Sequence, residues 1–330
     1  VGESSGATGE NVDCGGKCKT DFSDLRFTNL ANAQLDYWIE SISGTTPNQL
    51  ATVWIEFDSI GTTATTFYMY YGKADAIAVS NGENTFPFFD HFDGDLSKWT
   101  TNYGTPAVAS SIVTFNGTQY ERITTTALYG TNYAFRAQVG MDGSYGGGIC
   151  FDEHHGLGNF DTGTAKFSLR TYRTDWGAAT ETDVSNKISG SNILEVRRNA
   201  STSVIAVLND TVVATHTTNF VTVDSGGRIG LNGTNGTFTS DWALIRQCLA
   251  TEPAWGSWGA EEYDGSFTTE SAVASATMDG ITPIESTTES AEATDTFDGD
   301  SLRDSFTESA EATDTFGNER TSYGPTTESA

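Results

Sequence analysis

Basic residues and long apolar runs are scarce in this sequence, and each shortage excludes a class of function. Only 17 Lys and Arg residues stand against 44 Asp and Glu residues, which gives a formal net charge of −27. A charge of this sign and size repels nucleic-acid phosphates and anionic membranes, so we expect neither as a partner. The sequence also has no run of 18 apolar residues, and we therefore predict no membrane-spanning helix.

Helical periodicity is nearly absent as well. Short runs rich in Val, Ile, Thr, Tyr and Phe recur instead, separated by Gly, Asn, Asp and Ser, which is the pattern of an all-β chain. Residues 51–60 and 65–71 are predicted strands of a first β-sandwich that occupies residues 1–86. A longer series of short strands predicts a second sandwich, of the jelly-roll type, in residues 87–262, with residues 252–262 as its closing edge strand.

Residues 263–330 form an acidic repeat. Glu270, Glu289, Glu308 and Glu328 mark a period of 19 to 20 residues, and the last copy stops at its fourth residue, so we expect the polypeptide to continue beyond Ala330. Within each copy, the alanines and the final large apolar residue occupy alternate positions, which indicates strands with a narrow apolar face. Stacked copies would form a stalk or fibre. A flexible acidic linker is the alternative, because the apolar content is low.

Five ordered motifs carry a family resemblance. They are Gly16–Thr28 (GKCKTDFSDLRFT), Leu35–Ser41 (LDYWIES), Ala51–Glu56 (ATVWIE), Phe67–Gly72 (FYMYYG) and Ser80–Phe86 (SNGENTF). Together they resemble an uncharacterised domain family of archaeal, bacterial and phage surface proteins, which commonly precedes a concanavalin A-like or laminin-G-like sandwich. The stretches from Phe89 to Trp99 and from Trp255 to Glu262 look like the entry and exit of that sandwich, whereas the repeats resemble those of phage fibres in composition.

The resemblance implies an extracellular, cell-surface or virion-surface β-module used in attachment or assembly. Members of the family usually open with an additional strand before the Cys-containing loop, and little precedes that loop here. We therefore expect the first sandwich to lack an edge strand, which a neighbouring subunit would supply as the chain self-assembles into a homo-oligomer or filament.

Four cysteines allow three disulfide pairings. Cys14 and Cys18 flank a flexible loop that can close a small disulfide, and Cys150 with Cys248 would form the second. A zinc site would require both pairs to converge, but Cys248 has no histidine near it in the sequence. We therefore prefer disulfides.

Catalytic motifs are missing from the sequence. Glycosidases on concanavalin A-like sandwiches use paired carboxylates in a Glu-x-Asp-x-x-Glu or Glu-x-Asp-x-Glu pattern, and neither pattern occurs. Residues 152–155 (DEHH) combine acids and possible metal ligands, but consecutive strand residues point to opposite faces, so they converge only in a loop. We predict that the chain is not an enzyme.

Two binding sites are candidates. Trp176 lies in a predicted loop with Tyr172 and Arg173 nearby, and an exposed aromatic ring with polar neighbours is suited to glycan binding.

A structural calcium ion is the second candidate. Sandwiches of the resembled type often hold their first and last strands together with one ion, and carboxylates suit Ca²⁺. Asp90 and Asp93 at the entry of the second sandwich and Asp241 at its exit are the predicted ligands.

Three functions follow from these observations. The first is a non-enzymatic structural and adhesive module of a surface appendage or filament. The second is a carbohydrate-binding module of a larger polysaccharide-degrading protein, with cell-surface glycans as partners. The third, a hydrolase on the second sandwich, is the one that the missing motifs disfavour.

Overall fold

A computed structural model describes residues 1–4, 12–60, 64–116, 121–130, 132–143, 147–151, 155–159, 166–172, 178–199, 203–217, 228–231, 236–249, 252–261, 271–279, 295–297 and 314–316. The predicted all-β fold is confirmed, since strands account for nearly all of its regular structure. The chain divides into two units. Unit 1 comprises Val1–Ser80 with Pro253–Ala330, and unit 2 comprises Asn81–Glu252.

Unit 1 contains a five-stranded and a two-stranded antiparallel sheet. The five-stranded sheet has the order β2-β1-β5-β22-β21, and β3 pairs with β4 in the other sheet. The strands are β1 (Arg26–Asn29), β2 (Gln34–Leu35), β3 (Tyr37–Ser43), β4 (Leu50–Ile55), β5 (Thr65–Tyr71), β21 (Ala254–Trp258) and β22 (Ser271–Asp279).

The core of unit 1 is aromatic. Phe67 and Met69 of β5 are fully buried, and Trp255 and Trp258 of β21 pack edge-on against Phe67, with ring centroids 5.9 and 5.6 Å from it. Because these tryptophans pack in unit 1, residues 254–258 belong to this unit and not to the second sandwich, where the sequence analysis placed them. The indole pair therefore joins chain segments that lie almost 200 positions apart.

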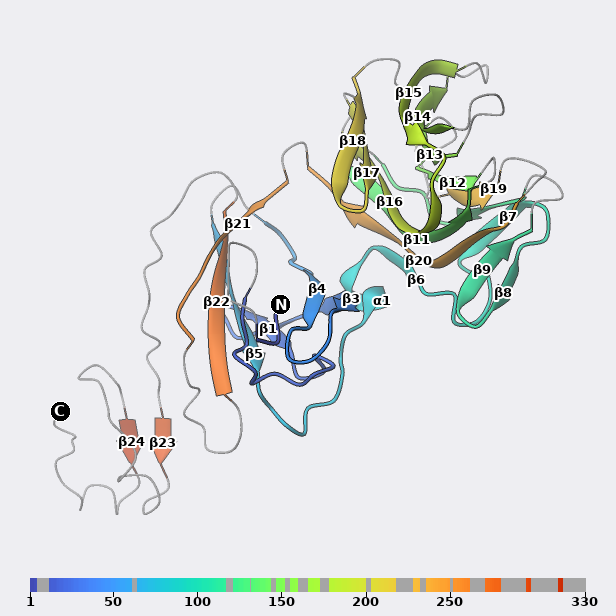
Figure 1. Ribbon diagram of the computed structural model, residues 1–330. Coiled ribbons are helices and arrows are strands. Elements are labelled where there is room, and N and C mark those ends of the chain that lie inside the picture. Colours follow the sequence, from blue (N-terminus) through green and yellow to red (C-terminus); the bar gives the residue numbers. More distant parts are fainter. Residues whose placement is uncertain are drawn as a thin grey trace. The chain divides into compact units, whose positions relative to one another are not determined.

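The first acidic repeat supplies the fourth strand of this sheet. β22 lies between β5 and β21 (Figure 1), with Ala274 opposite Met69 and Ala276 opposite Phe67. The strand alternation predicted for this copy thus places its alanines beside the buried residues of β5. A missing strand was expected to come from a neighbouring subunit, but here the partner of β5 comes from the same chain.

Unit 2 is a sandwich of two large antiparallel sheets. One has seven strands in the order β15-β14-β13-β12-β19-β10-β7, and the other has eight, in the order β18-β17-β16-β11-β20-β9-β8 with β6 also paired to β20. Figure 1 shows β11 and β20 in one sheet and β12 and β19 in the other.

The bounds of the seven-stranded sheet are β7 (Trp99–Tyr103), β10 (Glu121–Thr125), β12 (Gly147–Cys150), β13 (His155–Gly158), β14 (Lys166–Tyr172), β15 (Ala178–Asn186) and β19 (Arg228–Leu231). Those of the eight-stranded sheet are β6 (Phe88–Asp90), β8 (Ala107–Ala109), β9 (Ile112–Phe115), β11 (Tyr133–Asp142), β16 (Ser189–Asn199), β17 (Ser203–Leu208), β18 (Thr211–His216) and β20 (Phe238–Gln247). The short helix α1 (Gly82–Thr85) begins at Asn81, whose side chain accepts from the backbone N–H groups of Glu83 and Asn84.

Every second residue of the central strands points between the two sheets of unit 2. Ile123, Ile149 and Leu157 from the seven-stranded sheet are fully buried with Phe135, Val196 and Ile245 from the eight-stranded sheet. Tight turns connect several of these strands. Asn209 and Asp210, with φ of +46° and +64°, join β17 to β18, and both residue types tolerate this left-handed conformation.

The remaining strands belong to the later repeats. β23 (Asp295–Phe297) and β24 (Asp314–Phe316) pair in parallel, so that identical residues of two copies stand opposite each other. None of the helices among the described residues is long and apolar enough to cross a membrane.

The role of β22 predicts the effect of an acidic substitution. Ala276 stands opposite fully buried Phe67, and the two later copies carry Asp at the equivalent position. Ala276→Asp should lower the free energy of unfolding of unit 1 by about 2 kcal/mol or more, because an unpaired charge would enter the core. Thr277→Asp on the alternate face is the matched control. Equal and small losses in urea unfolding for both variants would show that β22 does not occupy this place.

Candidate functional site

The outer face of the seven-stranded sheet is the best candidate site. We use this name for the residues that alternate along its strands with the buried core residues. In β10, Arg122 and Thr124 flank the core residue Ile123, and in β14, Ser168 and Arg170 alternate with Phe167 and Leu169. These side chains lie outside the core cluster, although Thr124 and Ser168 are themselves buried.

A row of glycines crosses the middle of this face. Arg122 is opposite Gly230, Gly230 is opposite Gly148, Gly148 is opposite Gly158, and Gly158 is opposite Ser168. Three neighbouring strands therefore carry no side chain at this level of the sheet. Gly148, Gly158 and Ser168 are buried, so the accessible part of the row lies at its Arg122 end.

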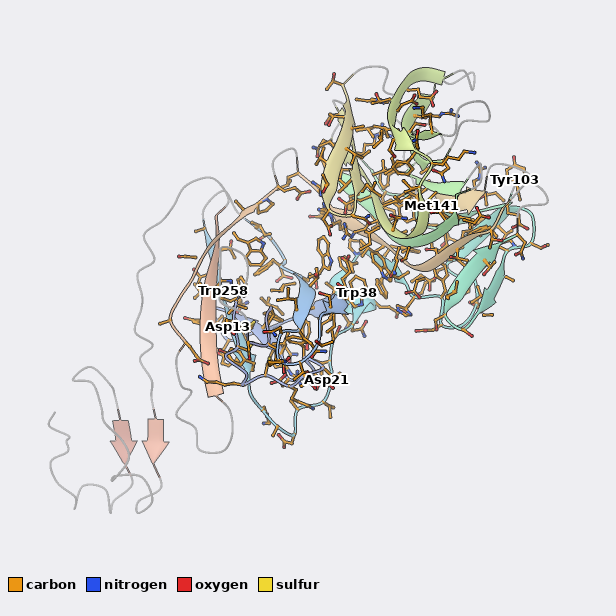
Figure 2. All side chains as sticks on the ribbon, viewed as in Figure 1. Asp13, Asp21, Trp38, Tyr103, Met141 and Trp258 are labelled. Carbon is orange, nitrogen blue, oxygen red and sulfur yellow. The ribbon has the colours of Figure 1, made fainter. Side chains whose placement is uncertain are left out.

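Tyr103 marks the accessible end. It closes β7, the edge strand, and 56% of its side chain is exposed, which makes it the one exposed Phe, Trp or Tyr among the residues that the structure describes. The guanidinium carbon of Arg122 lies 5.0 Å from the centre of its ring. Figure 2 shows Tyr103 at the margin of unit 2, away from Met141 in the core. One face of the ring is thus held by a cation.

Polar groups flank Tyr103 on the same two strands. The hydroxyl of Thr124 donates to the side-chain oxygen of Asn102, and Asn102 is itself exposed. Thr124 and Asn102 therefore place a hydroxyl and an amide beside the ring. Nothing in the motifs of the sequence pointed to Tyr103, because the stretch TTNYG has the composition of a turn.

The other end of the row holds a charged network. Glu181 of β15 accepts hydrogen bonds from Ser168 Oγ at 3.0 Å and from Arg170 Nε at 2.7 Å. Ser168 is fully buried, whereas the side chains of Arg170 and Glu181 are 16% and 31% exposed, so water reaches part of this network.

The predicted glycan site is not tested by the structure. Tyr172 ends β14, but its side chain is not described, and Trp176 and Arg173 lie outside the described residues. Residues 152–154 of the acidic and histidine cluster lie outside them too, and His155 opens β13 with its side chain not described. Both assignments stay predictions.

The three predicted calcium ligands do not form a site. Asp90 is buried, and its two oxygens accept from Phe92 N at 2.9 Å and from Trp99 Nε1 at 2.5 Å. Asp93 is exposed and accepts from Ser111 Oγ, which lowers the pKa of its carboxyl. No three His, Cys, Asp or Glu side chains within the described ranges, Asp241 included, lie close enough to hold a metal ion.

All four cysteines are free thiols. The Cys14 and Cys18 side chains hydrogen-bond each other, which together with burial raises the pKa of Cys14. Cys150 lies in the seven-stranded sheet, whereas Cys248 follows β20 of the other sheet and donates weakly to the carbonyl of Arg198. Burial raises the pKa of Cys248 to about 11. The structure contains neither the Cys14–Cys18 nor the Cys150–Cys248 bond, and both disulfides stay predictions.

A buried ionic cluster lies on the eight-stranded sheet. The carboxylate of Glu195 is fully buried and contacts Arg246 Nη2 at 2.9 Å, Arg136 Nη1 at 3.4 Å and the Nε of Arg197. Burial alone would raise the pKa of Glu195, but the charges of Arg246, Arg136 and Arg197 lower it to about 2. A strongly shifted pKa often marks a functional group, yet no solvent reaches this carboxylate, so we assign it a structural role.

Substitution of Glu195 should reveal this role. Glu195→Gln leaves three guanidinium groups without their shared anion and should reduce the free energy of unfolding of unit 2 by about 3 kcal/mol at pH 7. Since the pKa of Glu195 is lower in the folded state, its stabilisation is present above about pH 4.5 and is lost as the pH falls toward 2. The variant should therefore lose less stability on acidification.

Glu83→Gln is the control for this prediction. Glu83 pairs with Lys98 at the surface, so its removal should cost at most about 1 kcal/mol. Chemical denaturation at pH 7 and pH 3 measures both variants, and similar losses for the two would contradict a special role for Glu195.

Comparison with known families identifies one domain. Residues 21–102 match the model of a family described as "Domain of unknown function (DUF2341)", which confirms the resemblance to an uncharacterised domain family. The matched segment extends from unit 1 into the first strands of unit 2, β6 and β7, and the rest of the jelly-roll sandwich follows it. No curated protein matches the chain. The likeness of the repeats to phage fibres stays a prediction.

Several solved structures resemble about half of the chain. A β-1,3-1,4-glucanase (lichenase) from a mouse hindgut metagenome is 10% identical over 48% of this chain and 98% of its own, with a TM-score of 0.41. The Crh5 transglycosylase in complex with NAG is 13% identical over 51% of this chain and 85% of its own, with a TM-score of 0.39. The Emp47p carbohydrate recognition domain is 11% identical over 48% and 94%, with a TM-score of 0.37.

This comparison contradicts our prediction that the chain is not an enzyme. Similar structures include a lichenase, a second β-glucanase and a transglycosylase. The exclusion relied on the absence of one linear motif, but carboxylates for glycosidic chemistry can also come from different strands or loops. Enzymatic activity is therefore not excluded.

Proposed function

We propose that unit 2 binds carbohydrate on the outer face of its seven-stranded sheet, at the end marked by Tyr103. The exposed ring of Tyr103 is the observation that carries this proposal. Large aromatic side chains are normally buried, and the other Phe, Trp and Tyr residues that the structure describes are buried or half-buried. An aromatic ring kept in solvent beside polar groups indicates a contact surface.

The surroundings of Tyr103 suit a sugar. Arg122 lies against the ring, and the free ring surface can stack on the C–H face of a pyranose. Asn102, which is exposed and is positioned by a hydrogen bond from the buried Thr124 hydroxyl, brings an amide to the same place, where it can bond sugar hydroxyls.

Binding of this kind is common to recognition modules and to enzymes that act on polysaccharides. The proposal therefore concerns the contact between chain and glycan, at an extracellular surface. It replaces Trp176 with Tyr103 as the stacking residue to be tested first, because the exposure and the neighbours of Tyr103 are described.

Removal of the Tyr103 ring should weaken glycan binding. Tyr103→Ala should lower the affinity of the full chain for its best polysaccharide by about two- to twelvefold, since aromatic stacking contributes about 0.5–1.5 kcal/mol. Affinity electrophoresis against soluble β-glucans, chitosan and polyuronates measures the change. Leu128→Ala removes another exposed apolar side chain, 64% accessible, from the same unit and should have no effect. Equal affinities for the Tyr103 variant and the unmodified chain would refute the site.

We propose further that the acidic repeats assemble into a stalk by parallel stacking. The supporting observation is the pairing of β23 with β24, where Asp295 is opposite Asp314 and Phe297 is opposite Phe316. Copies of one sequence that pair in register can extend the ladder with each further copy, from the same chain or another. Like charges face each other at Asp295, so stacking should be sensitive to salt.

Sedimentation velocity of the full chain tests the stalk. Self-association should increase with salt, and Asp295→Asn combined with Asp314→Asn should increase it already at low salt. Asp300→Asn combined with Asp304→Asn changes the same net charge outside the paired strands and should leave the salt response as it is. A chain that stays monomeric in every case would rule the stalk out.

A further inference from the structure

The charge of the seven-stranded sheet differs from that of the whole chain. Its six strands apart from β15 contain four basic residues and one acidic residue, namely Arg122, Lys166, Arg170, Arg228 and Glu121. In the whole chain, acidic residues outnumber basic ones by 44 to 17. These strands thus reverse the charge balance of the protein.

The basic residues all occupy positions of the outer face. Lys166 and Arg170 alternate with the core residues Phe167 and Leu169, and Arg122 precedes the core residue Ile123. Arg228 also occupies an outer-face position, because the next residue in β19, Ile229, is opposite the core residues Ile123 and Ile149.

The single acidic residue, Glu121, occupies a position that alternates with those of the outer face and therefore faces the core. Glu121 is 5% exposed and accepts a hydrogen bond from the backbone N–H of Asn116 at 2.6 Å. Its charge is therefore engaged within the sandwich. Glu181 and Asp183 on the edge strand β15 are the nearest acids by register, and Glu181 is bonded to Arg170. Among the strand residues of β7, β10, β19, β12 and β13, the outer positions include two arginines and no Asp or Glu.

We propose that the ligand of this face is an acidic polysaccharide, whose uronate or sulfate groups bond Arg122 and its basic neighbours. This inference rests on the proposed carbohydrate function and specifies its substrate class. Guanidinium groups bond carboxylates and sulfates through two parallel N–H donors. A chain with net charge −27 repels an anionic polymer at long range, so such binding requires positive charge at the point of contact.

The neighbours of Arg122 favour a sugar polymer over a nucleic acid. Arg122 is stacked on Tyr103, and the exposed Asn102 beside it offers an amide of the kind that bonds sugar hydroxyls. Phosphate recognition of a nucleic acid uses many basic contacts, whereas this face has four basic positions spread over three strands.

Binding of the full chain to three probes tests the inference. The probes are oligogalacturonate, a neutral β-1,3-1,4-glucan oligosaccharide and a single-stranded oligodeoxynucleotide, each measured by isothermal titration. We expect measurable affinity for oligogalacturonate, and this affinity should fall as the salt concentration is raised. Arg122→Gln should weaken this binding about tenfold, because a hydrogen bond to a charged group is lost. Lys166→Gln, at a position without a stacked ring, should weaken it about threefold.

Lys98→Gln is the matched control. It removes one positive charge from unit 2, but Lys98 pairs with Glu83 outside the outer face, so binding should not change. Equal losses for Lys98→Gln and Arg122→Gln would overturn the inference, because general charge and not this face would then be responsible.

The three probes distinguish a failure of the acidic-ligand inference from a failure of the proposed carbohydrate function. Affinity for the neutral glucan alone, with no effect of salt or of Arg122→Gln, would leave the proposed function standing and overturn the acidic ligand. Affinity for the oligonucleotide above that for oligogalacturonate would also overturn it. Absence of binding to either oligosaccharide would overturn the proposed function itself.

Discussion

The alternation of side chains along strands is the constraint on which the rest of this structure depends. In unit 2, two large sheets bury every second residue against each other, and the apolar side chains Ile123, Ile149 and Phe135 leave no room for charge between them. Most charged groups of these strands then lie on the outer faces, and Glu121, which does not, accepts a hydrogen bond within the sandwich. The two faces differ in chemistry, because one buries the cluster around Glu195 and the other keeps Tyr103 in solvent.

Unit 1 obeys the same constraint with a strand taken from far along the chain. Phe67 and Met69 of β5 need neighbours on one side of the sheet, and the first acidic repeat meets this need with the alanines of β22. The later copies carry Asp where this copy has Ala276, so they are poorly suited to the same place. One repeat thus belongs to a folded unit, while the pairing of β23 with β24 allows the others to associate with each other.

Local patterns in the sequence were enough to predict the all-β class, the strands near residues 51–55 and 65–71, and the strand in the first repeat. They could not assign β21 to unit 1, because the alternation of a strand does not specify its partner. They also missed Tyr103 and the Glu195 cluster, since Arg122, Arg136 and Arg246 come close to their partners only through the folding of distant strands. The prediction that the chain is not an enzyme failed, because the absence of one linear carboxylate motif does not exclude catalytic carboxylates from different strands or loops.

The central claim is that the outer face of the seven-stranded sheet, and not that of the eight-stranded sheet, contacts the ligand. Hydrogen–deuterium exchange of the full chain with and without a saturating oligogalacturonate measures this directly. The account predicts slower exchange of backbone amides in β7 and β10, around Tyr103 and Arg122, with no change in β11 and β16 around Glu195. Protection confined to β11 and β16, or to unit 1, would contradict it.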